Sequence, residues 1–291
     1  MVKYRIGIIG AENSHADCFA REINLPDENG NYRYPDCRIT CVYGHYPEAN
    51  EKLAREYDIK VSQSVEEMLG EVDAVMVTAR DGKYHYEFAK PFVEAGMPAF
   101  VDKPFTVDPT EAEALVALAK EKKVPLCGGS SLKFTDGIQD LKKLLRETDG
   151  ELFGGAMSAP VSLYSEYSGF FFYSSHLTEM TLEVFGYEPK SVSAMKHDHS
   201  VCATIHYDGF SVANHFKEGN PDYTACVYLA GNPQLTQINL DNCGERECAA
   251  FVEMLRTGQM HNTYEELVAP VYYMNAVKKA YETGETVPVK P

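Results

Sequence analysis

The chain has 291 residues, of which 44% are hydrophobic and 24% are charged. This composition is typical of a globular protein, and the length favours two domains over a single hydrophobic core. It carries 27 basic and 43 acidic residues, a formal net charge of -16. Because such a charge repels phosphate backbones, we expect no nucleic-acid partner. The sequence has no apolar run of about eighteen residues, so we also expect no membrane span.

The N-terminus and the cysteines indicate a compartment. Residues 1–5 lead directly into a predicted strand and have no signal-peptide pattern. Eight cysteines without a secretory signal predict reduced thiols, and we therefore expect a cytoplasmic protein. Neither the cysteine spacings nor the segment His197-Asp198-His199 has the ligand pattern of a zinc site, so no metal is expected.

The first 128 residues alternate between predicted strands and helices. Apolar runs of strand length occur at residues 5–10, 38–43, 73–78, 99–101 and 124–127. Helical patterns and caps occur from about residue 14 and at residues 47–57, 64–67, 84–95 and 108–122. Repeated strand–helix units of this length predict an α/β fold with a parallel sheet and right-handed crossovers.

The second half has a different order of elements. Helices are predicted at residues 137–146 and 176–185 with a strand between them, and again at 246–257 and 264–282. Several strands fall between residues 191 and 240. Strands in succession, flanked by helices, predict an α+β domain with a mostly antiparallel open sheet.

Several different motifs follow one another along the chain. Asp102-Lys103-Pro104 follows the strand near residue 100, and Lys133-Phe134 follows the last strand of the first half. Further on come Ser175-His176-Leu177-Thr178-Glu179 and a closing segment at 251–287. In order and spacing these motifs resemble the glucose–fructose oxidoreductase / inositol dehydrogenase / MocA (Gfo/Idh/MocA) family over nearly the whole chain. That family has Glu-Lys-Pro where this chain has Asp-Lys-Pro.

The resemblance implies a fold and an activity. Residues 1–128 would form a Rossmann domain that binds NADP or NAD, and residues 129–291 a domain for substrate binding and oligomerisation. The implied enzyme is an NAD(P)-dependent dehydrogenase that moves a hydride between the cofactor and a sugar, polyol or similar small hydroxy compound. Family members pair through the open sheet, so a homodimer or homotetramer is expected.

The turn after the first strand departs from the dinucleotide fingerprint. That fingerprint wants glycine at its first, third and sixth positions, but the segment Gly10-Ala11-Glu12-Asn13-Ser14-His15 keeps only Gly10. The amides at the start of the following helix still form an anion site in principle. Glu12 would repel a pyrophosphate unless it points away. The segment therefore is either an altered cofactor loop or a loop with weakened or lost cofactor binding.

Other cofactor residues follow from position and from the resemblance. Gly44 stands where an acid would accept from the ribose 2′-hydroxyl of NAD, and His45 could approach a 2′-phosphate, which slightly favours NADP. The resemblance adds Ala79, Arg80, Asp102 and Lys103 at the strand ends, and the histidine that follows the first of these ends, His85.

Two residues are candidates for catalysis. Lys103 directly follows a parallel strand, at the sheet edge where such folds bind ligands. The resemblance implies that it contacts the substrate and assists proton transfer. His176 would be the base, but the family's partner aspartate four residues earlier is Phe172 here. The alternatives are a surface lysine before a turn and a histidine retained for packing at the start of a helix.

Aromatic residues precede this histidine. Tyr164, Tyr167 and Tyr173 could line a substrate pocket, since sugar rings pack well on aromatic rings. Phe170 to Phe172 fit a core or interface strand better. On the predicted sheet we expect an exposed apolar face made by Ala203, Ile205, Val212, Ala225, Val227 and Leu229.

Two other classes of function stay open on the same fold. Glu12, Gly44 and Phe172 are also consistent with a catalytically silent ligand-binding protein. A third possibility is a subunit whose sheet mainly builds an oligomer. Cofactor binding separates the enzyme from the other two.

Overall fold

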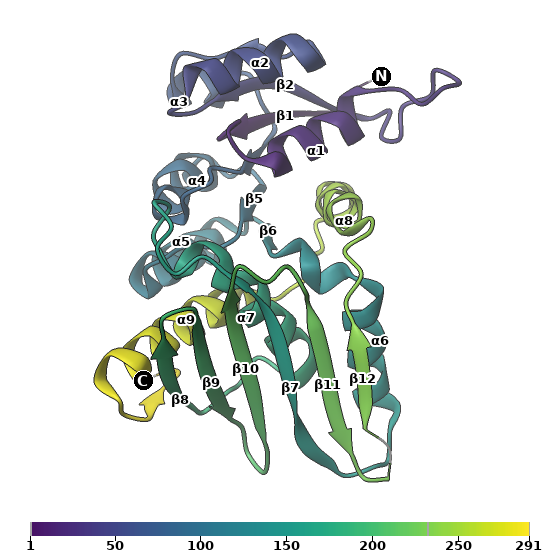
Figure 1. The fold of residues 1–291 in the computed structure, drawn as a ribbon. Coiled ribbons are helices and arrows are strands. Elements are labelled where there is room, and N and C mark those ends of the chain that lie inside the picture. The colour runs from purple at the N-terminus through teal and green to yellow at the C-terminus, as the bar shows by residue number, and fades with distance from the viewer. Residues whose placement is uncertain (1, 232, 291) are drawn as a thin grey trace. The chain divides into compact units, whose positions relative to one another are not determined.

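The computed structural model describes residues 2–231 and 233–290. The chain forms two compact units, which Figure 1 shows coloured along the sequence. The first unit comprises Met1–Thr106, Thr110–Gly129 and Gly244–Leu267. The second comprises Val107–Pro109, Ser130–Cys243 and Val268–Pro291.

The first unit is built on a parallel sheet. In the described residues it has six strands in the order β3-β2-β1-β4-β5-β6, and every neighbouring pair is parallel. The strands are β1 (Tyr4–Ile9), β2 (Cys37–Tyr43), β3 (Lys60–Val61), β4 (Ala74–Val77), β5 (Ala99–Asp102) and β6 (Leu126–Gly129). This is the doubly wound order expected of a Rossmann domain, so the predicted fold class is confirmed for this half.

Helices connect these strands as the sequence predicts. They are α1 (Ser14–Asn24), α2 (Pro47–Tyr57), α3 (Val65–Leu69), a 3-10 turn η1 (Gly82–Tyr84), α4 (His85–Glu94) and α5 (Pro109–Lys122). The apolar strands are buried because helices cover the sheet, and Ile6 and Ile8 of β1 have no exposed surface.

A later segment of the chain returns to the first unit. The segment Gly244–Leu267 contains helix α8 (Cys243–Thr257) apart from its first residue, and the start of α9 (Tyr264–Thr283). The Phe251 ring is edge-on to Phe100 of β5, with ring centroids 6.1 Å apart, and both residues belong to one buried cluster. The chain passes from the first unit to the second between Gly129 and Ser130, and the segment Gly244–Leu267, which the sequence prediction placed in the second domain, groups with the first unit.

The second unit contains a mixed sheet. Its described strands, seven in all, run in the order β12-β11-β7-β10-β9-β8-β13. Every neighbouring pair is antiparallel except β7 with β10, which confirms the mostly antiparallel sheet. The strands are β7 (Leu152–Val161), β8 (Ser191–His197), β9 (Ser200–His206), β10 (Ser211–Glu218), β11 (Thr224–Leu229), β12 (Gln234–Gln237) and β13 (Val287–Pro288).

The helices of this unit are η2 (Ser131–Phe134), α6 (Asp136–Glu147), α7 (Phe171–Phe185) and the greater part of α9. Helix α7 begins five residues before the predicted start, so Phe171 and Phe172 are helical and the strand alternative was wrong. His176 consequently lies on the second turn of α7 rather than at its start. No helix in the described residues is long and apolar enough to cross a membrane.

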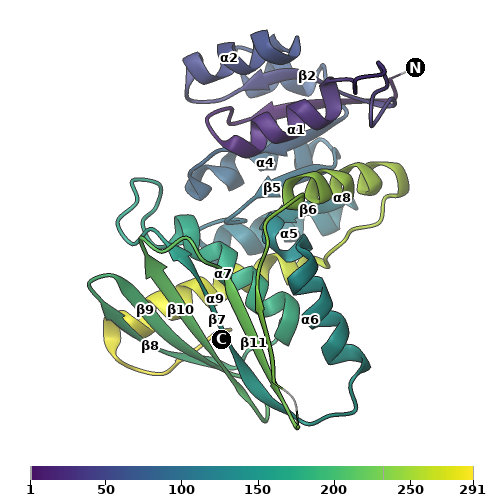
Figure 2. The same ribbon diagram turned by 45° about the vertical axis from the view of Figure 1, so that its right-hand side comes forward.

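The two faces of the second sheet differ. Figure 2 shows α7 and α9 on one face of it. The apolar residues expected on the open face, from Ala203 to Leu229, are instead buried in the core beneath the helices. Strand alternation therefore places their neighbours, among them Cys202, His215 and Tyr228, on the open face.

Candidate active site

The turn after β1 requires glycine. Gly10 has a φ of 98°, and a Cβ built on it would lie 2.3 Å from the Ala79 backbone. The Gly10 amide donates to the Tyr43 carbonyl at 2.9 Å, and the Thr78 hydroxyl donates to the Gly10 carbonyl at 2.8 Å. The turn is therefore fixed between the carboxyl ends of β2 and β4, where ligands of open α/β sheets bind.

Helix α1 begins directly after this turn and is tied to β5. Asn13 is its N-cap, and the Asn13 side chain accepts a hydrogen bond from the His15 amide at 3.3 Å. The same side chain donates to Asp102 Oδ2 at 2.9 Å. His15 Nδ1 lies 3.0 Å from Asp102 Oδ1 and 2.9 Å from Oδ2. The cofactor-loop residues and Asp102, predicted separately from the sequence, thus form one cluster.

The charges of this cluster support one another. Burial lowers the pKa of His15, but the charge and hydrogen bond of Asp102 outweigh that effect and raise the pKa to about 9. Burial alone would raise the pKa of Asp102, yet the His15 cation holds it below its ordinary value. His15 Nδ1 also lies 3.9 Å from the buried carboxylate of Glu247 on α8. The helix start therefore carries a protonated imidazole at neutral pH.

Glu12 is directed toward the end of β4. Its Oε1 atom accepts from the Arg80 amide at 2.9 Å, and the Arg80 guanidinium donates to the Glu12 carbonyl. Glu12 Oε2 is shielded from solvent and has no hydrogen-bond partner among the described residues. A pyrophosphate has no hydrogen to offer this oxygen, whereas a ribose hydroxyl has one. The arrangement fits the sugar of a dinucleotide beside Glu12 better than a phosphate.

The residues at the end of β2 combine close packing with an exposed ring. A Cβ on Gly44 would lie 3.1 Å from the Gly10 amide nitrogen, and Asn50 donates to the Gly44 carbonyl at 2.9 Å. His45 is exposed, with its ring 4.7 Å from that of Tyr84. Because Gly44 has no side chain, the turn after β2 can lie close to the turn after β1. The His45 ring is exposed beside these turns.

The remaining predicted residues of this unit lie at the ends of β4 and β5. The buried ring of His85 bridges two carbonyl oxygens, with Nδ1 2.7 Å from that of Pro104 and Nε2 2.7 Å from that of Ala79. Lys103 directly follows β5, is only 5% exposed, and donates its amide to Asp102 Oδ1 at 2.6 Å. Asp102 therefore links Lys103 to the loop at the start of α1.

The residues present fit a dinucleotide. Gly10 allows the turn to pack directly against the Ala79 backbone, which a side chain at this position would prevent. Ser14, in the first turn of α1, is exposed, and a protonated His15 follows it. Gly10 to His15 would hold the cofactor, with Ala11 and Ser14 presenting backbone and Glu12 accepting from a hydroxyl.

In the second unit, His176 has a partner that the sequence did not predict. His176 Nδ1 lies 2.7 Å from Ser130 Oγ, and both residues are buried. Ser130 follows β6 and caps η2, where its hydroxyl oxygen accepts from the Leu132 amide at 3.2 Å. Phe172 stands where an aspartate was expected from the resemblance. The group beside the His176 ring is instead the neutral hydroxyl of Ser130.

A second contact fixes this pair on α7. Glu179 Oε2 accepts from the Ser130 amide at 2.7 Å, and the Lys133 ammonium lies 3.5 Å from the same oxygen. All three residues are buried. Glu179 lies one turn after His176, so the start of η2 is held against two successive turns of α7.

The predicted aromatic residues separate into two groups. The rings of Tyr167, Phe172, Tyr173 and His176 follow one another with centroid separations of 5.3, 5.4 and 5.0 Å. Tyr164 is 73% exposed and lies beneath the Lys196 ammonium, 4.7 Å from it. The structure thus brings Tyr167 and Tyr173 toward His176 but gives Tyr164 a different neighbour.

The predicted residues therefore form two clusters, one in each unit. Gly10 to His15, Gly44, Ala79, Arg80, His85, Asp102 and Lys103 gather at the carboxyl edge of the parallel sheet. Tyr167, Tyr173 and His176 gather on α7 and the segment before it. That Lys103 and His176 meet at one substrate stays a prediction. Ser130 also directly follows a parallel strand, but its position alone does not indicate the contact with His176.

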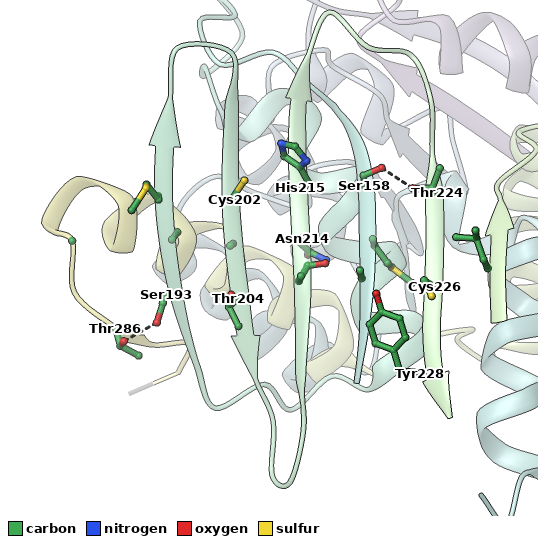
Figure 3. Close-up of a pocket in the computed structure, with 18 residues that line it drawn as sticks. Ser158, Ser193, Cys202, Thr204, Asn214, His215, Thr224, Cys226, Tyr228 and Thr286 are labelled. Atoms are coloured by element: carbon green, nitrogen blue, oxygen red, sulfur yellow. Dashed lines mark hydrogen bonds between the residues drawn. The ribbon is translucent and has the colours of Figure 1, made fainter. Parts of the chain in front are cut away.

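The open face of the second sheet bears a groove of about 960 Å³ (Figure 3). Its lining includes Cys202, His215 and Tyr228, together with the exposed side chains of Met195 and Leu235. His176 does not line it, and α7 lies on the opposite face. The groove is therefore separate from His176 and its partners on α7.

Comparison with known proteins identifies the first unit. Residues 4–129 match a family model described as an oxidoreductase family with an NAD-binding Rossmann fold. A UDP-N-acetylglucosamine 3-dehydrogenase of Acidithiobacillus ferrooxidans is 31% identical over 106 residues, 36% of this chain and 34% of the relative. The myo-inositol dehydrogenase Hyg17 of Streptomyces leeuwenhoekii is 39% identical over 106 residues, 36% of this chain and 32% of the relative. The match thus spans about a third of the length of these curated relatives.

Solved structures extend the likeness to both units. The structure of GenD2 from gentamicin A biosynthesis, in complex with NAD, has a TM-score of 0.86 at 16% identity and covers 99% of this chain and 97% of its own. A scyllo-inositol dehydrogenase from Lactobacillus casei, with NAD(H) and scyllo-inositol, has a TM-score of 0.85 at 15% identity and covers 99% and 100%. At these identities the likeness shows that the fold is shared over the full length.

Proposed function

We propose that the chain is a nicotinamide-dependent dehydrogenase of the Gfo/Idh/MocA family, because residues 4–129 match the model of that NAD-binding oxidoreductase family. Its substrate is a sugar, a polyol such as an inositol, or a similar small hydroxy compound. The cofactor supplies or accepts the hydride, and the protein binds, orients and protonates.

One observation carries this proposal. Asp102 contacts Asn13 and His15 at the start of α1 and also accepts from the amide of Lys103. The cofactor loop and the lysine are therefore linked through one buried carboxylate. A lysine in this place can hold a proton near the oxygen of a substrate whose carbon faces the nicotinamide.

His176 is the second group at the reacting oxygen in this proposal. It is buried, and its ring is fixed by Ser130 on one side and packed against Tyr173 on another. Tyr167 and Tyr173 supply flat surfaces of the kind on which sugar rings pack.

We infer NAD(H) as the cofactor, in keeping with the NAD-binding description of the family model. NADP(H) is the second candidate, and the end of β2 favours it: Gly44 offers no carboxylate to a ribose 2′-hydroxyl, and His45 is exposed beside it. A titration with both cofactors decides between them.

We propose that the chain forms a homodimer or homotetramer through the open face of the second sheet. Met195, Tyr228 and Leu235 are 62%, 44% and 78% exposed on this face. Large apolar side chains gathered around a groove are typical of an interface between subunits. A cytoplasmic location is part of the same proposal, since all cysteines in the described residues are free thiols.

The test of the activity is a panel assay. The protein is incubated with NAD or NADP and a set of inositols and aldoses, and formation of reduced nicotinamide is followed. We expect turnover with at least one polyol and a loss of about a hundredfold in Lys103→Met. Equal rates in the wild type and Lys103→Met, or no reaction of any member with either cofactor, would contradict the proposal.

A further inference from the structure

The contact between Ser130 and His176 determines which nitrogen of the histidine carries the proton. We propose that Ser130 positions His176 as the tautomer protonated at Nε2, so that His176 acts as a hydrogen-bond donor to the substrate oxygen and not as its base. The inference about the role rests on the proposed dehydrogenase function, but the tautomer itself can be measured without cofactor or substrate.

The hydroxyl of Ser130 has few possible hydrogen-bond partners. Its oxygen already accepts a hydrogen bond from the Leu132 amide at 3.2 Å. Within the described residues, the one acceptor near its proton is His176 Nδ1, at 2.7 Å. If the hydroxyl donates to Nδ1, every group of the contact is satisfied, and the proton of the neutral imidazole lies on Nε2.

The opposite arrangement leaves a proton unsatisfied. If Nδ1–H donated to Ser130 Oγ, that oxygen would accept two hydrogen bonds and its own buried hydroxyl proton would lack an acceptor among the described residues. A buried donor without a partner is disfavoured, and we expect the Nε2–H tautomer to prevail by about tenfold.

A carboxylate in place of the Ser130 hydroxyl would favour the other tautomer of His176. An ionised acid can only accept, so it would require a proton on Nδ1 and would leave the Nε2 lone pair free to act as a base. It would also stabilise the imidazolium. Ser130 is neutral, and the nearby Glu179 carboxylate accepts from the Ser130 amide and pairs with Lys133. His176 therefore is set to donate from Nε2, and proton transfer falls to Lys103.

The geometry of the contact is held by the fold. Ser130 is fixed as the N-cap of η2, and its amide is anchored to Glu179, one turn beyond His176 on α7. If the hydroxyl moved away from His176 Nδ1, the hydrogen bond that its oxygen accepts from the Leu132 amide would also break. This rigidity makes Ser130 a positioning residue for His176.

The experiment is a long-range ¹H–¹⁵N NMR spectrum of protein labelled with ¹⁵N-histidine, at a pH above the ordinary imidazole pKa. A His176→Gln spectrum identifies the His176 signals. We expect the pattern of a proton on Nε2 in the wild type. In Ser130→Ala the population protonated at Nδ1 should rise several-fold, whereas Ser130→Thr, which keeps the hydroxyl, should match the wild type.

Ser131→Ala is the matched control, because Ser131 is the adjacent buried serine and its side chain makes no hydrogen bond within the described residues. It should leave the tautomer unchanged. A proton on Nδ1 in the wild type overturns the proposal, as does an unchanged tautomer in Ser130→Ala. If Ser130→Ala does not fold, the wild type and Ser130→Thr decide the question. Failure to bind a nicotinamide would refute the proposed function and leave this result standing.

Discussion

Removal of the His15 imidazole should make the protein less stable at neutral pH but not at alkaline pH. His15 pairs through Nδ1 with the fully buried carboxylate of Asp102 at 2.9 Å. The variant His15→Gln keeps a polar side chain of similar reach and removes the positive charge. It leaves Asp102 buried beside Asn13 without a cation at this position, which is the costly half of breaking a buried pair.

The magnitude follows from the pKa of His15, which the Asp102 charge raises against burial from 6.5 to about 9. A raised pKa contributes stability that is fully present below 6.5 and is lost as the pH rises through about 9. For these two pKa values, linkage gives a contribution of about 2.5 kcal/mol at pH 7 and less than about 0.5 kcal/mol at pH 9. The wild type should therefore lose about 2 kcal/mol over this interval relative to His15→Gln.

The assay is urea unfolding of both proteins at several values between pH 6 and pH 10, with the difference in unfolding free energy plotted against pH. Taking the difference removes the alkaline titration of buried thiols such as Cys18, whose pKa burial raises to about 11 in both proteins. His199→Gln, at an exposed histidine, is the control and should show no such trend. A difference that does not change with pH would refute the charged His15–Asp102 pair.

Three further changes test other parts of the molecule. Lys103→Met should reduce turnover by about a hundredfold and leave cofactor affinity nearly unchanged, as measured by steady-state kinetics and titration; an equal loss of both would mean that the lysine only holds the loop. Gly10→Ala should destabilise the first unit by about 3 kcal/mol and abolish cofactor binding, because its φ is 98° and the new Cβ would meet the Ala79 backbone. Normal urea unfolding in this variant would show that the turn is more adaptable than the structure indicates. Leu235→Glu on the open sheet face should convert an oligomer into single chains in light scattering, whereas a wild type with the mass of one chain would refute the proposed interface.

The parallel sheet was predictable because its strands are buried on both faces. Apolar runs that end in glycine or a polar motif are local signals, and Lys103 could be placed at the end of β5 from them alone. Strand β3 was missed because it consists only of Lys60–Val61, too short to show a pattern. The start of α7 was missed because aromatic residues favour strands in isolation, and packing in the core overrides that preference.

Other features depend on contacts between distant residues. The alternation in β9 to β11 gives a period of two, but it does not tell which face the helices cover, and the open face was therefore assigned to the wrong residues. A helical pattern at 246–257 says nothing about which of two cores it joins. Ser130 is the clearest case in the candidate site. A lone serine after a strand has no chemical signature until the His176 ring is seen 2.7 Å away.

The altered loop from Gly10 to His15 should still bind a nicotinamide dinucleotide. A fluorescence titration with NADH and with NADPH tests it most directly, with Gly10→Ala as the variant whose turn cannot form. We expect saturable binding of at least one cofactor in the micromolar range by the wild type and none by the variant. No saturable signal from the wild type with either cofactor, up to millimolar concentrations, would contradict it.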